Sequence, residues 1–444
     1  MKKNKNSLLL LIICCTLYLS AFTSVAQIQC GPMVCYSDMK EVMLWIQTKS
    51  ATKVKIQYFD QAEPTKKYST DEVQTEKAHA YTAHLVADEV EPGKKYTYEV
   101  WLNGKKANIS YPLTFQTQTL WQYRTEPPNF KFVVRSCTYV NEPQYDRPGQ
   151  AYGGNYEIFT NIYKQQPDFM IWTGDNNYLR EVDWNTRTGV FHRYSHSRSV
   201  PEMQPLLGSA HHYAIWDDHD YGPNDSDRGF WTKNLTLEAF KTFWGNPNYI
   251  FENEGVTGTF MWNDCQFFLL DDRWWRSPND DKSPKRDYFG EKQVQWLLDA
   301  LTTSRAPFKF IIAGGQVINP AKIFENYANY EDERSRLLKA ITDAKIPGVL
   351  FVSGDRHHSV VMKQDRSGSY PLYDFTISPL TSGPSKPVKE EEGTIQVDGT
   401  LVTERNFATM EVSGKRTDRV LKVSVFGTKG DLKWTKEIKA SELK

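Results

Sequence analysis

Two patterns of hydrophobic positions divide the chain into an N-terminal and a C-terminal part. Between residues 27 and 118, short segments either alternate polar and apolar residues or run through β-branched and aromatic ones; the clearest are 41–46, 54–58 and 96–101. Turn signals separate them at Glu91-Pro92-Gly93 and Asn103-Gly104. Because no helical periodicity intervenes, residues 27–118 are predicted to form a fibronectin- or immunoglobulin-like β-sandwich that serves packing or docking.

The pattern changes after a linker near Glu126-Pro127-Pro128, and residues 130–444 are predicted to form one larger domain. Apolar runs here end in polar or acidic residues, as strands buried on both faces of a sheet do; they span 132–137, 169–175, 213–218, 267–272, 308–316 and 349–355. Segments with one apolar face at helical spacing lie between them, at 156–163, 294–301 and 337–341. We therefore predict an α/β domain of β-sheet layers flanked by helices. Residues 385–399 are predicted to be a solvated loop, and those from 407 onward a last set of strands.

Composition narrows the classes of function. Lysine plus arginine and aspartate plus glutamate both number 54 among the 444 residues, so the chain has no net charge. A nucleic-acid scaffold would need a basic face, for which this balance gives no support. The hydrophobic share of 39% is that of a folded globular protein. No feature of the sequence predicts an oligomeric state.

The first 26 residues have the pattern of a secretory signal peptide. Lysines at 2, 3 and 5 precede an apolar stretch from Leu8 to Ala21, and Ser24-Val25-Ala26 is a small-residue cleavage site. The apolar stretch is short for a membrane span, which needs about 20 residues. We therefore expect cleavage after Ala26, export to the periplasm, cell surface or medium, and no membrane span.

Export would leave four cysteines in the mature chain: Cys30, Cys35, Cys137 and Cys265. An oxidising compartment permits disulfides, and Cys30 and Cys35 are near enough in sequence to pair, but the sequence leaves this open. Cys137 stands at a predicted strand end, where it is either a buried structural cysteine or a metal ligand.

Polar residues at four predicted strand ends form the candidate active site. They are Ser136-Cys137, Gly174-Asp175-Asn176-Asn177-Tyr178, Asp217-Asp218-His219-Asp220 and Gly354-Asp355-Arg356-His357-His358. Functional groups of such sheets gather at the carboxyl ends of the strands. Carboxylates suit hard cations, whereas imidazole and thiolate suit softer ones. A carboxylate at the tip of a buried strand is costly without a counter-charge, and a role as a ligand shared by two ions would explain Asp175 at this position.

These segments, in this order and spacing, resemble the alkaline phosphatase D (PhoD-like) family of metallophosphatases, and the β-domain before them resembles that family's N-terminal domain. The most specific matches are Gly174-Asp175-x-x-Tyr178, Trp216-Asp217-Asp218-His219 and Ser353-Gly354-Asp355-Arg356-His357. The resemblance implies a metallophosphatase-type fold and an exported phosphoesterase, either an alkaline phosphatase or a phosphodiesterase. Its substrate would be a small phosphate ester or a phospholipid, hydrolysed by a metal-activated hydroxide.

The resemblance also implies a set of metal ligands: Cys137, Asp175, Tyr178, Asp218, Gln316, Asp355 and His357. Cys137, Asp175 and Tyr178 would hold Fe3+, with His357 or Asp355 completing that site. Asp218 and Asp355 would hold Ca2+ or another divalent ion, with Asp175 as the bridge. Gln316 stands where broader metallophosphoesterases place a histidine. Two residues would act on the substrate: His219 as proton donor or charge stabiliser, and Arg356 as a clamp on a phosphate oxygen.

Two other functions stay open. Purple acid phosphatases share the Asp-x-x-Tyr spacing and a leading β-sandwich, although the Asp-Asp-His and Gly-Asp-x-His signatures argue against them. A non-catalytic exported binding protein would use the ions only to brace its fold.

Four neighbouring residues have less definite roles. Asp217 is as well suited to accept a hydrogen bond from a backbone amide as to bind a metal, and His358 either supports a ligand or faces solvent. Asp271 and Asp272, beside Arg273-Trp274-Trp275-Arg276, are predicted to form a structural ion pair. The loops at 182–203 and 381–399 are expected to border the substrate cleft.

Overall fold

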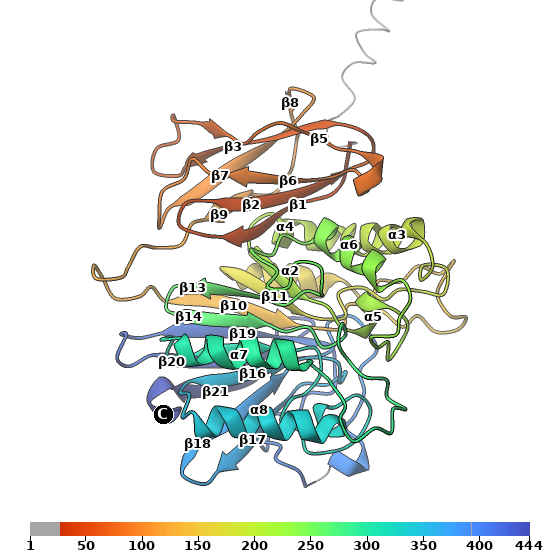
Figure 1. Cartoon of the computed structure of the whole chain (residues 1–444). Coiled ribbons are helices and arrows are strands. Elements are labelled where there is room, and N and C mark those ends of the chain that lie inside the picture. The colour runs from red at the N-terminus through yellow and green to blue at the C-terminus, as the bar shows by residue number, and fades with distance from the viewer. Residues whose placement is uncertain (1–26, 392) are drawn as a thin grey trace, which may run out of the picture.

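The structure, a computed structural model, describes residues 27–391 and 393–444. The predicted signal peptide, residues 1–26, lies outside this range. Figure 1 shows a β-sandwich at one end of the molecule and two large β-sheets with covering helices below it. The predicted fold class, an α/β fold of sheet layers flanked by helices and preceded by a β-sandwich, is confirmed. Among the described residues, no helix combines the length and apolar character that crossing a bilayer requires.

The sandwich consists of nine strands from the first part of the chain. They are β1 (Ile28–Ser37), β2 (Val42–Thr48), β3 (Lys53–Asp60), β4 (Tyr68–Ser69), β5 (Val73–Gln74), β6 (Thr82–Ala87), β7 (Lys95–Leu102), β8 (Lys105–Lys106) and β9 (Thr114–Gln116). Strands β1, β2 and β6 form one layer and the remaining strands the other. Alternate residues such as Leu44, Ile56 and Tyr98 fill the core between the layers.

One layer of this sandwich continues into the large sheet of the second domain. That sheet has the order β21-β20-β19-β10-β11-β12-β1-β2-β6, and β1 pairs in parallel with β12 at Val34 and His211. The sequence pattern did not predict this continuity, because alternation along one strand does not identify its neighbour. The sandwich is therefore bonded through its backbone to the sheet that holds the candidate site.

The second domain contains two facing sheets. The nine-stranded sheet adds β10 (Phe130–Arg135), β11 (Phe169–Thr173), β12 (His211–Ile215), β19 (Asn406–Ser413), β20 (Val420–Gly427) and β21 (Leu432–Lys439). The six-stranded sheet has the order β13-β14-β15-β16-β18-β17, formed by β13 (Gly258–Trp262), β14 (Cys265–Leu269), β15 (Lys309–Ile312), β16 (Val349–Ser353), β17 (Val360–Arg366) and β18 (Ser369–Thr376). Strands β10, β11 and β12 are parallel neighbours, as are β14, β15 and β16.

Helices cover the outer faces of the two sheets. They are α2 (Glu157–Lys164), α3 (Arg187–Arg198), α4 (Gln204–Leu207), α5 (Asp218–Tyr221), α6 (Lys233–Phe243), α7 (Glu291–Thr303) and α8 (Glu331–Asp343). Single 3-10 turns lie at η2 (Lys77–His79), η3 (Pro201–Met203), η4 (Tyr327–Tyr330), η5 (Lys389–Glu391) and η6 (Ala440–Glu442). The three predicted amphipathic segments correspond to α2, α7 and α8.

Alternation along the central strands explains these layers. Phe132 and Phe169 pack with Phe267 and Phe310 of the facing sheet, in the core that α7 and α8 close from outside. The intervening residues of the same strands, such as Met170, turn to the opposite face and pack with α2, α3 and α6. A sheet covered on both faces requires the near-continuous apolar runs seen in the sequence.

Candidate metal centre

The predicted strand-end residues meet at one edge of the two sheets. Cys137, Asp175 and Asp218 follow β10, β11 and β12 of one sheet, and Asp355 follows β16 of the other. Glycines allow the strand ends to approach. A Cβ atom on Gly174 would lie 2.6 Å from the Cβ of Asp217, and one on Gly354 would lie 2.5 Å from the Ser136 side chain, both closer than real Cβ contacts.

Four of the candidate residues have a left-handed backbone conformation. The φ angles are 58° at Cys137, 51° at Asp175, 63° at Asp355 and 56° at His357. Non-glycine residues in this region cost about 1–3 kcal/mol each and persist where surrounding structure enforces them, often at functional sites. The backbone is thus held in a conformation that turns these side chains toward one another.

The first group combines thiol, carboxylate, phenol and imidazole. The Tyr178 hydroxyl donates to Asp175 Oδ2 at 3.1 Å and lies 3.3 Å from His357 Nε2. The Cys137 thiol donates to the same carboxylate oxygen at 3.5 Å. Ligand atoms of Cys137, Asp175 and His357 all lie within 4.8 Å of one another. The three residues predicted to hold Fe3+ are therefore brought together with His357, one of the two residues predicted to complete that site.

Asp175 also belongs to two further groups that meet the same 4.8 Å limit. One joins it to Asp218 and His219, and the other to Asp217 and Asp355. A carboxylate shared by neighbouring groups is what the predicted bridging role requires. Asp218, which is in the second group, recurs in another cluster with Asp225 and Glu325.

The electrostatics of these groups favour bound cations. Burial raises the pKa of Asp175 well above its ordinary value, and neighbouring Cys137 and Asp218 raise it further. Burial likewise raises the pKa of Asp355 to about 6. Burial and the Asp355 carboxylate raise the pKa of the Cys137 thiol. Ionised carboxylates and thiolate would thus repel each other at neutral pH, and positive charge among them would remove that cost.

Asp217 supplies a further test of whether the residues fit bound cations. Its Oδ1 accepts a hydrogen bond from the Asp218 amide at 2.9 Å, which caps α5, as the sequence allowed. Its Oδ2 is buried and has no hydrogen-bond partner among the described residues. A buried carboxylate oxygen without a donor is costly, and a cation is a suitable partner. The donor set therefore fits a cluster of ions.

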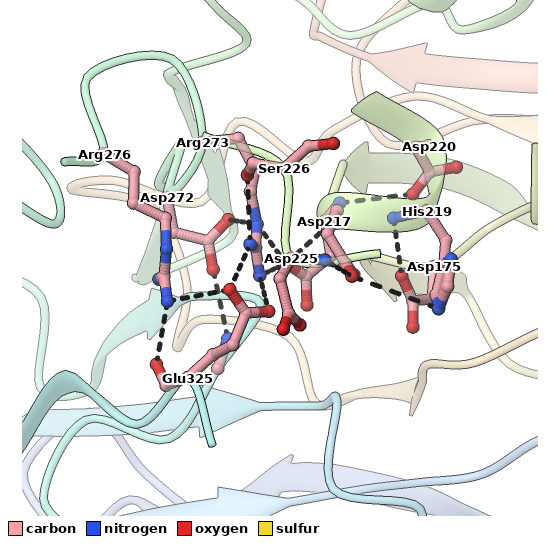
Figure 2. Close-up of polar contacts among 12 residues, drawn as sticks. Asp175, Asp217, His219, Asp220, Asp225, Ser226, Asp272, Arg273, Arg276 and Glu325 are labelled. Atoms are coloured by element: carbon pink, nitrogen blue, oxygen red, sulfur yellow. Dashed lines mark hydrogen bonds and ion pairs between the residues drawn. The ribbon is translucent and has the colours of Figure 1, made fainter. Parts of the chain in front are cut away.

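Arg273 supplies positive charge on the other side of Asp217. Figure 2 shows it between Asp217 and Glu325, with Asp175 and His219 beyond Asp217. Arg273 Nε donates to Asp217 Oδ1 at 2.6 Å, and its two terminal nitrogens donate to Glu325 at 2.8 and 2.9 Å. Arg273 is fully buried. Its Nε also lies 3.7 Å from Asp272 Oδ1, and these two residues form the structural ion pair predicted for Asp272.

The turn that carries Asp175 and Tyr178 is held by Asp220. The Asp220 carboxylate accepts hydrogen bonds from the backbone amides of Asn176 and Asn177 at 3.0–3.1 Å. Burial raises the pKa of Asp220 to about 7, although these amides oppose the rise. Asp220 thus links α5 to the turn after β11.

Two residues predicted to act in the site are engaged elsewhere. The Gln316 amide donates to Thr376 Oγ1 at 2.8 Å and accepts from Asn319 at 2.7 Å, so both ends of the side chain are occupied. Arg356 Nη2 donates to both oxygens of Glu391 at 3.0 Å. The contacts of Gln316 do not support a metal-ligand role, nor do those of Arg356 support a phosphate clamp. Glu391 is fully buried, so the prediction of a solvated loop is wrong at this residue.

The remaining residues that the sequence singled out are buried or bonded within the protein. Asp271 accepts hydrogen bonds from the backbone amides of Val256, Arg273 and Trp274. His358 is fully buried, so it does not face solvent. Cys30 and Cys35 are both free thiols, so the structure has no disulfide between them.

Asp225 and Glu325 were missed in the sequence. Both lie outside the regular strands and helices, and no apolar run precedes them as a signal. Only the fold brings them to Asp218.

A cavity of about 680 Å³ lies beside the metal centre. Tyr178 and His219 line it, and their rings lie 4.1 Å apart between centroids. The His219 side chain is 21% exposed, and its Nε2 lies 4.0 Å from Asp218 Oδ2. His219 is therefore in contact with both the carboxylate cluster and the open cavity.

Comparisons with known proteins agree with this arrangement. The sequence model of a family described as PhoD-like phosphatase matches residues 132–418, and one described as a domain of unknown function matches residues 25–120. Alkaline phosphatase D of Bacillus subtilis (strain 168) is 22% identical over 335 residues, which are 63% of this chain and 54% of that protein. The matched part thus spans about half of that relative's length.

Two solved structures share the fold across most of the chain. The structure of PhoD has a TM-score of 0.73 at 16% identity, covering 94% of this chain and 92% of that one. Purple acid phosphatase PPD1 from yellow lupin (Lupinus luteus) seeds has a TM-score of 0.68 at 11% identity, covering 94% and 75%.

Proposed function

The chain belongs to the PhoD-like phosphatase family, and from this premise we propose that it hydrolyses phosphate esters at the candidate metal centre. The observation that carries the proposal is the convergence of Cys137, Asp175, Tyr178 and His357 with Asp218 and Asp355 beside an open cavity. A phosphate ester in that cavity would meet the ligand cluster at Tyr178 and His219.

We infer two kinds of ion from the chemistry of the donors. Thiolate and phenolate in the group around Cys137 and Tyr178 favour Fe3+, whereas the carboxylates Asp218 and Asp355 favour Ca2+ or another hard divalent ion. Such cations neutralise phosphate oxygens and activate a water for in-line attack. Asp175, which belongs to three of the candidate groups, would be a ligand common to both kinds of ion.

Residues of the chain itself supply the proton donor and hold the site in place. His219 lies where the ligand cluster meets the cavity, so its imidazole is placed to donate a proton to the departing alkoxide. The Tyr178 ring packs against His219 and limits its rotation. Arg273 holds Asp217 in place next to Asp218, and Asp220 holds the turn of Asp175.

Replacing Asp175 with asparagine tests the proposal. We expect loss of bound metal by elemental analysis, together with a drop of at least about 1,000-fold in phosphate-ester hydrolysis, because the shared carboxylate is removed. Asp365→Asn is the matched control, since that side chain is 80% exposed and outside the site. Full activity of Asp175→Asn would disprove the bridging role.

The metal assignment has its own test. Fe3+ bound by phenolate or thiolate absorbs visible light, so the freshly purified protein should be coloured and contain iron. Colourless protein loaded with zinc alone would refute the assignment while leaving phosphate-ester hydrolysis possible.

Metal removal separates the enzyme from the binding-protein alternative, and sequence motifs argue against the purple acid phosphatase alternative. A binding protein whose ions only brace the fold would lose thermal stability on metal removal without ever having turned over an ester. The purple acid phosphatase fold is shared, so the fold does not distinguish that enzyme class. The motifs Trp216-Asp217-Asp218-His219 and Gly354-Asp355-Arg356-His357 support the PhoD-like assignment instead.

We also propose that the protein is exported. The charged, apolar and small-residue segments of residues 1–26 support this, and β1 begins at Ile28, so cleavage after Ala26 would leave the described fold whole. N-terminal sequencing of protein from the extracytoplasmic fraction should begin at Gln27. Uncleaved protein confined to the cytoplasm would refute the proposal.

A further inference from the structure

Apart from Tyr178 and His219, the residues that line the cavity beside the metal centre have no part in the chemistry proposed above. The walls of the cavity are formed by residues 139–152, which connect β10 to α2, and by residues 178–184, which follow β11. His219 and Asn224 complete the lining. The volume of about 680 Å³ is within the usual range of small-molecule sites, about 300–1,000 Å³. The cavity therefore has room for much more than a phosphate group.

Five aromatic side chains line these walls. Tyr139, Tyr145, Tyr152 and Trp184 all line the cavity, in addition to Tyr178. The Tyr152 ring packs edge-on against Tyr139 at 4.9 Å between centroids and is still 43% exposed. Aromatic faces bind planar rings by stacking, and this binding does not depend on the detailed hydrogen-bonding pattern of the ring.

Arg180 keeps this aromatic wall in place. Its guanidinium lies 3.9 Å above the Tyr139 ring and donates to Asp146 Oδ1 at 2.7 Å. It also donates to the backbone carbonyl of Val140 at 2.9 Å. These contacts join the two wall segments, so the wall is formed before any ligand binds.

The charges on the walls occur in pairs of opposite sign. Arg180 pairs with Asp146, and Arg147 lies 3.8 Å from Glu181. A site for a second phosphate or another anionic group would need unpaired positive charge. The lining instead favours an uncharged ligand portion.

We propose that this cavity binds the alcohol portion of the substrate and selects alcohols that carry a planar aromatic ring system of nucleoside size. The inference rests on the proposed function, because the ester must place its phosphate at Tyr178 and His219. The ring would stack on Tyr145 and Trp184, and the uncharged sugar or linker would span the distance to the metal centre.

Two monoesters with similar leaving groups test this selectivity. Adenosine 5′-monophosphate and glycerol 3-phosphate both release a primary alkoxide, so the chemical step is matched and the difference reports binding of the alcohol. We expect kcat/KM to be at least about tenfold higher for the nucleotide, the size of one stacking contact. Trp184→Leu and Tyr145→Leu should each reduce this ratio several-fold, toward one.

Tyr123→Leu is the control, since Tyr123 is fully exposed and outside the cavity lining; its ratio should equal that of the wild type. Adenosine without phosphate provides a measurement independent of turnover. By calorimetry it should bind the metal-loaded wild type and lose most of its affinity in Trp184→Leu, with thermal melting confirming that the variant is folded.

The outcomes separate this inference from the proposed function. A ratio near one in the wild type, or a ratio that neither cavity variant changes, overturns the selectivity while glycerol phosphate hydrolysis sustains the phosphoesterase. Adenosine binding that Trp184→Leu does not weaken also overturns it. If metal-loaded protein hydrolyses neither ester nor any other phosphate ester, the proposed function fails, and the substrate inference fails with it.

Discussion

Strand β12 buries titratable residues at both of its ends and satisfies them in different ways. At its start, His211 is fully buried, and its ring nitrogens contact the carbonyl of Cys35 and the amide of Gln116 at 2.8 and 3.2 Å. After its last residue, Asp217 and Asp218 are also buried, but as acids that Arg273 and neighbouring candidate ligands surround. The buried ring at the start of β12 is fully hydrogen-bonded to backbone groups, whereas the buried carboxylates beyond its end need additional positive charge.

This difference distinguishes a structural junction from a reactive site. A neutral imidazole bonded to two backbone groups fixes the contact between β12 and the sandwich and needs no partner from solution. Burial raises the pKa of Asp217 well above its ordinary value, so its ionised form is costly unless cations are supplied. At Asp218 the effect of burial is outweighed by His219 and Arg273, and the pKa is lowered to about 2. We therefore expect changes at the start of β12 to affect folding alone, and changes beyond its end to affect metal content and turnover.

The largest expected effect is on turnover at the reactive end. Replacing His219 with asparagine removes the proton donor placed beside the cavity, and kcat for an alkyl phosphate should fall by about 10²–10⁴-fold. For 4-nitrophenyl phosphate the loss should be far smaller, because that leaving group departs without a proton. His192→Asn, at a side chain 45% exposed, is the control. Equal losses on both esters would contradict the role as proton donor.

The next effect concerns stability at the same end. Arg273→Met leaves Asp217 buried without its cation, while Glu325 keeps only Arg276 as a partner. Breaking a buried pair in this way costs about 3–5 kcal/mol. Urea denaturation of the metal-free protein measures it. Arg336→Met is the comparison, because its pair with Asp332 is exposed and worth at most about 0.5 kcal/mol. A loss below about 1 kcal/mol for Arg273→Met would show that the network is not needed to offset the buried acids.

Local sequence signals explain how much of this arrangement was predictable. An apolar run followed by polar residues marks a buried strand and its end, so the positions of Asp175, Asp218 and Asp355 followed from the sequence. No such signal shows which way a side chain points beyond the strand end. The sequence therefore could not predict that Gln316 and Arg356 bond to other residues instead of facing the site.

Contacts between distant segments could not be predicted from the sequence either, because they too leave no local signal. The pairing of β1 with β12 depends on two strands about 180 residues apart, and neither shows the other in its pattern. Glu325 and Asp225 lie in irregular segments without periodicity. Their role in the site could be recognised only from the fold.

The third effect is a pH dependence at the structural end. Burial lowers the pKa of His211 from 6.5 to about 4, while its backbone contacts partly oppose the shift. The folded state therefore favours the neutral ring. The resulting stability is complete above pH 6.5 and decreases by about 3 kcal/mol as the pH falls to about 4, because the unfolded chain binds the proton first. Denaturant midpoints across this range measure the slope, and in His211→Asn the part due to this residue should disappear. An unchanged slope would show that His211 does not control the acid stability of the junction.

The smallest expected effect is on metal affinity, and it comes from Ser378, which is not itself a candidate metal ligand. Ser378 donates its hydroxyl to Cys137 Sγ at 3.1 Å and accepts the His357 amide at 3.0 Å, so it orients two candidate ligands at once. Removing such a supporting contact typically lowers metal affinity by 10–100-fold, about 1.4–2.7 kcal/mol. In Ser378→Ala, a chelator should compete for the metal at correspondingly lower concentration, and the visible band of bound iron should shift because the thiolate loses a hydrogen bond. Ser335→Ala, whose hydroxyl makes only an exposed contact with Glu331, should change neither. If the band and the affinity are both unchanged in Ser378→Ala, Ser378 does not support Cys137 and His357 as ligands, and its contacts with them are structural only.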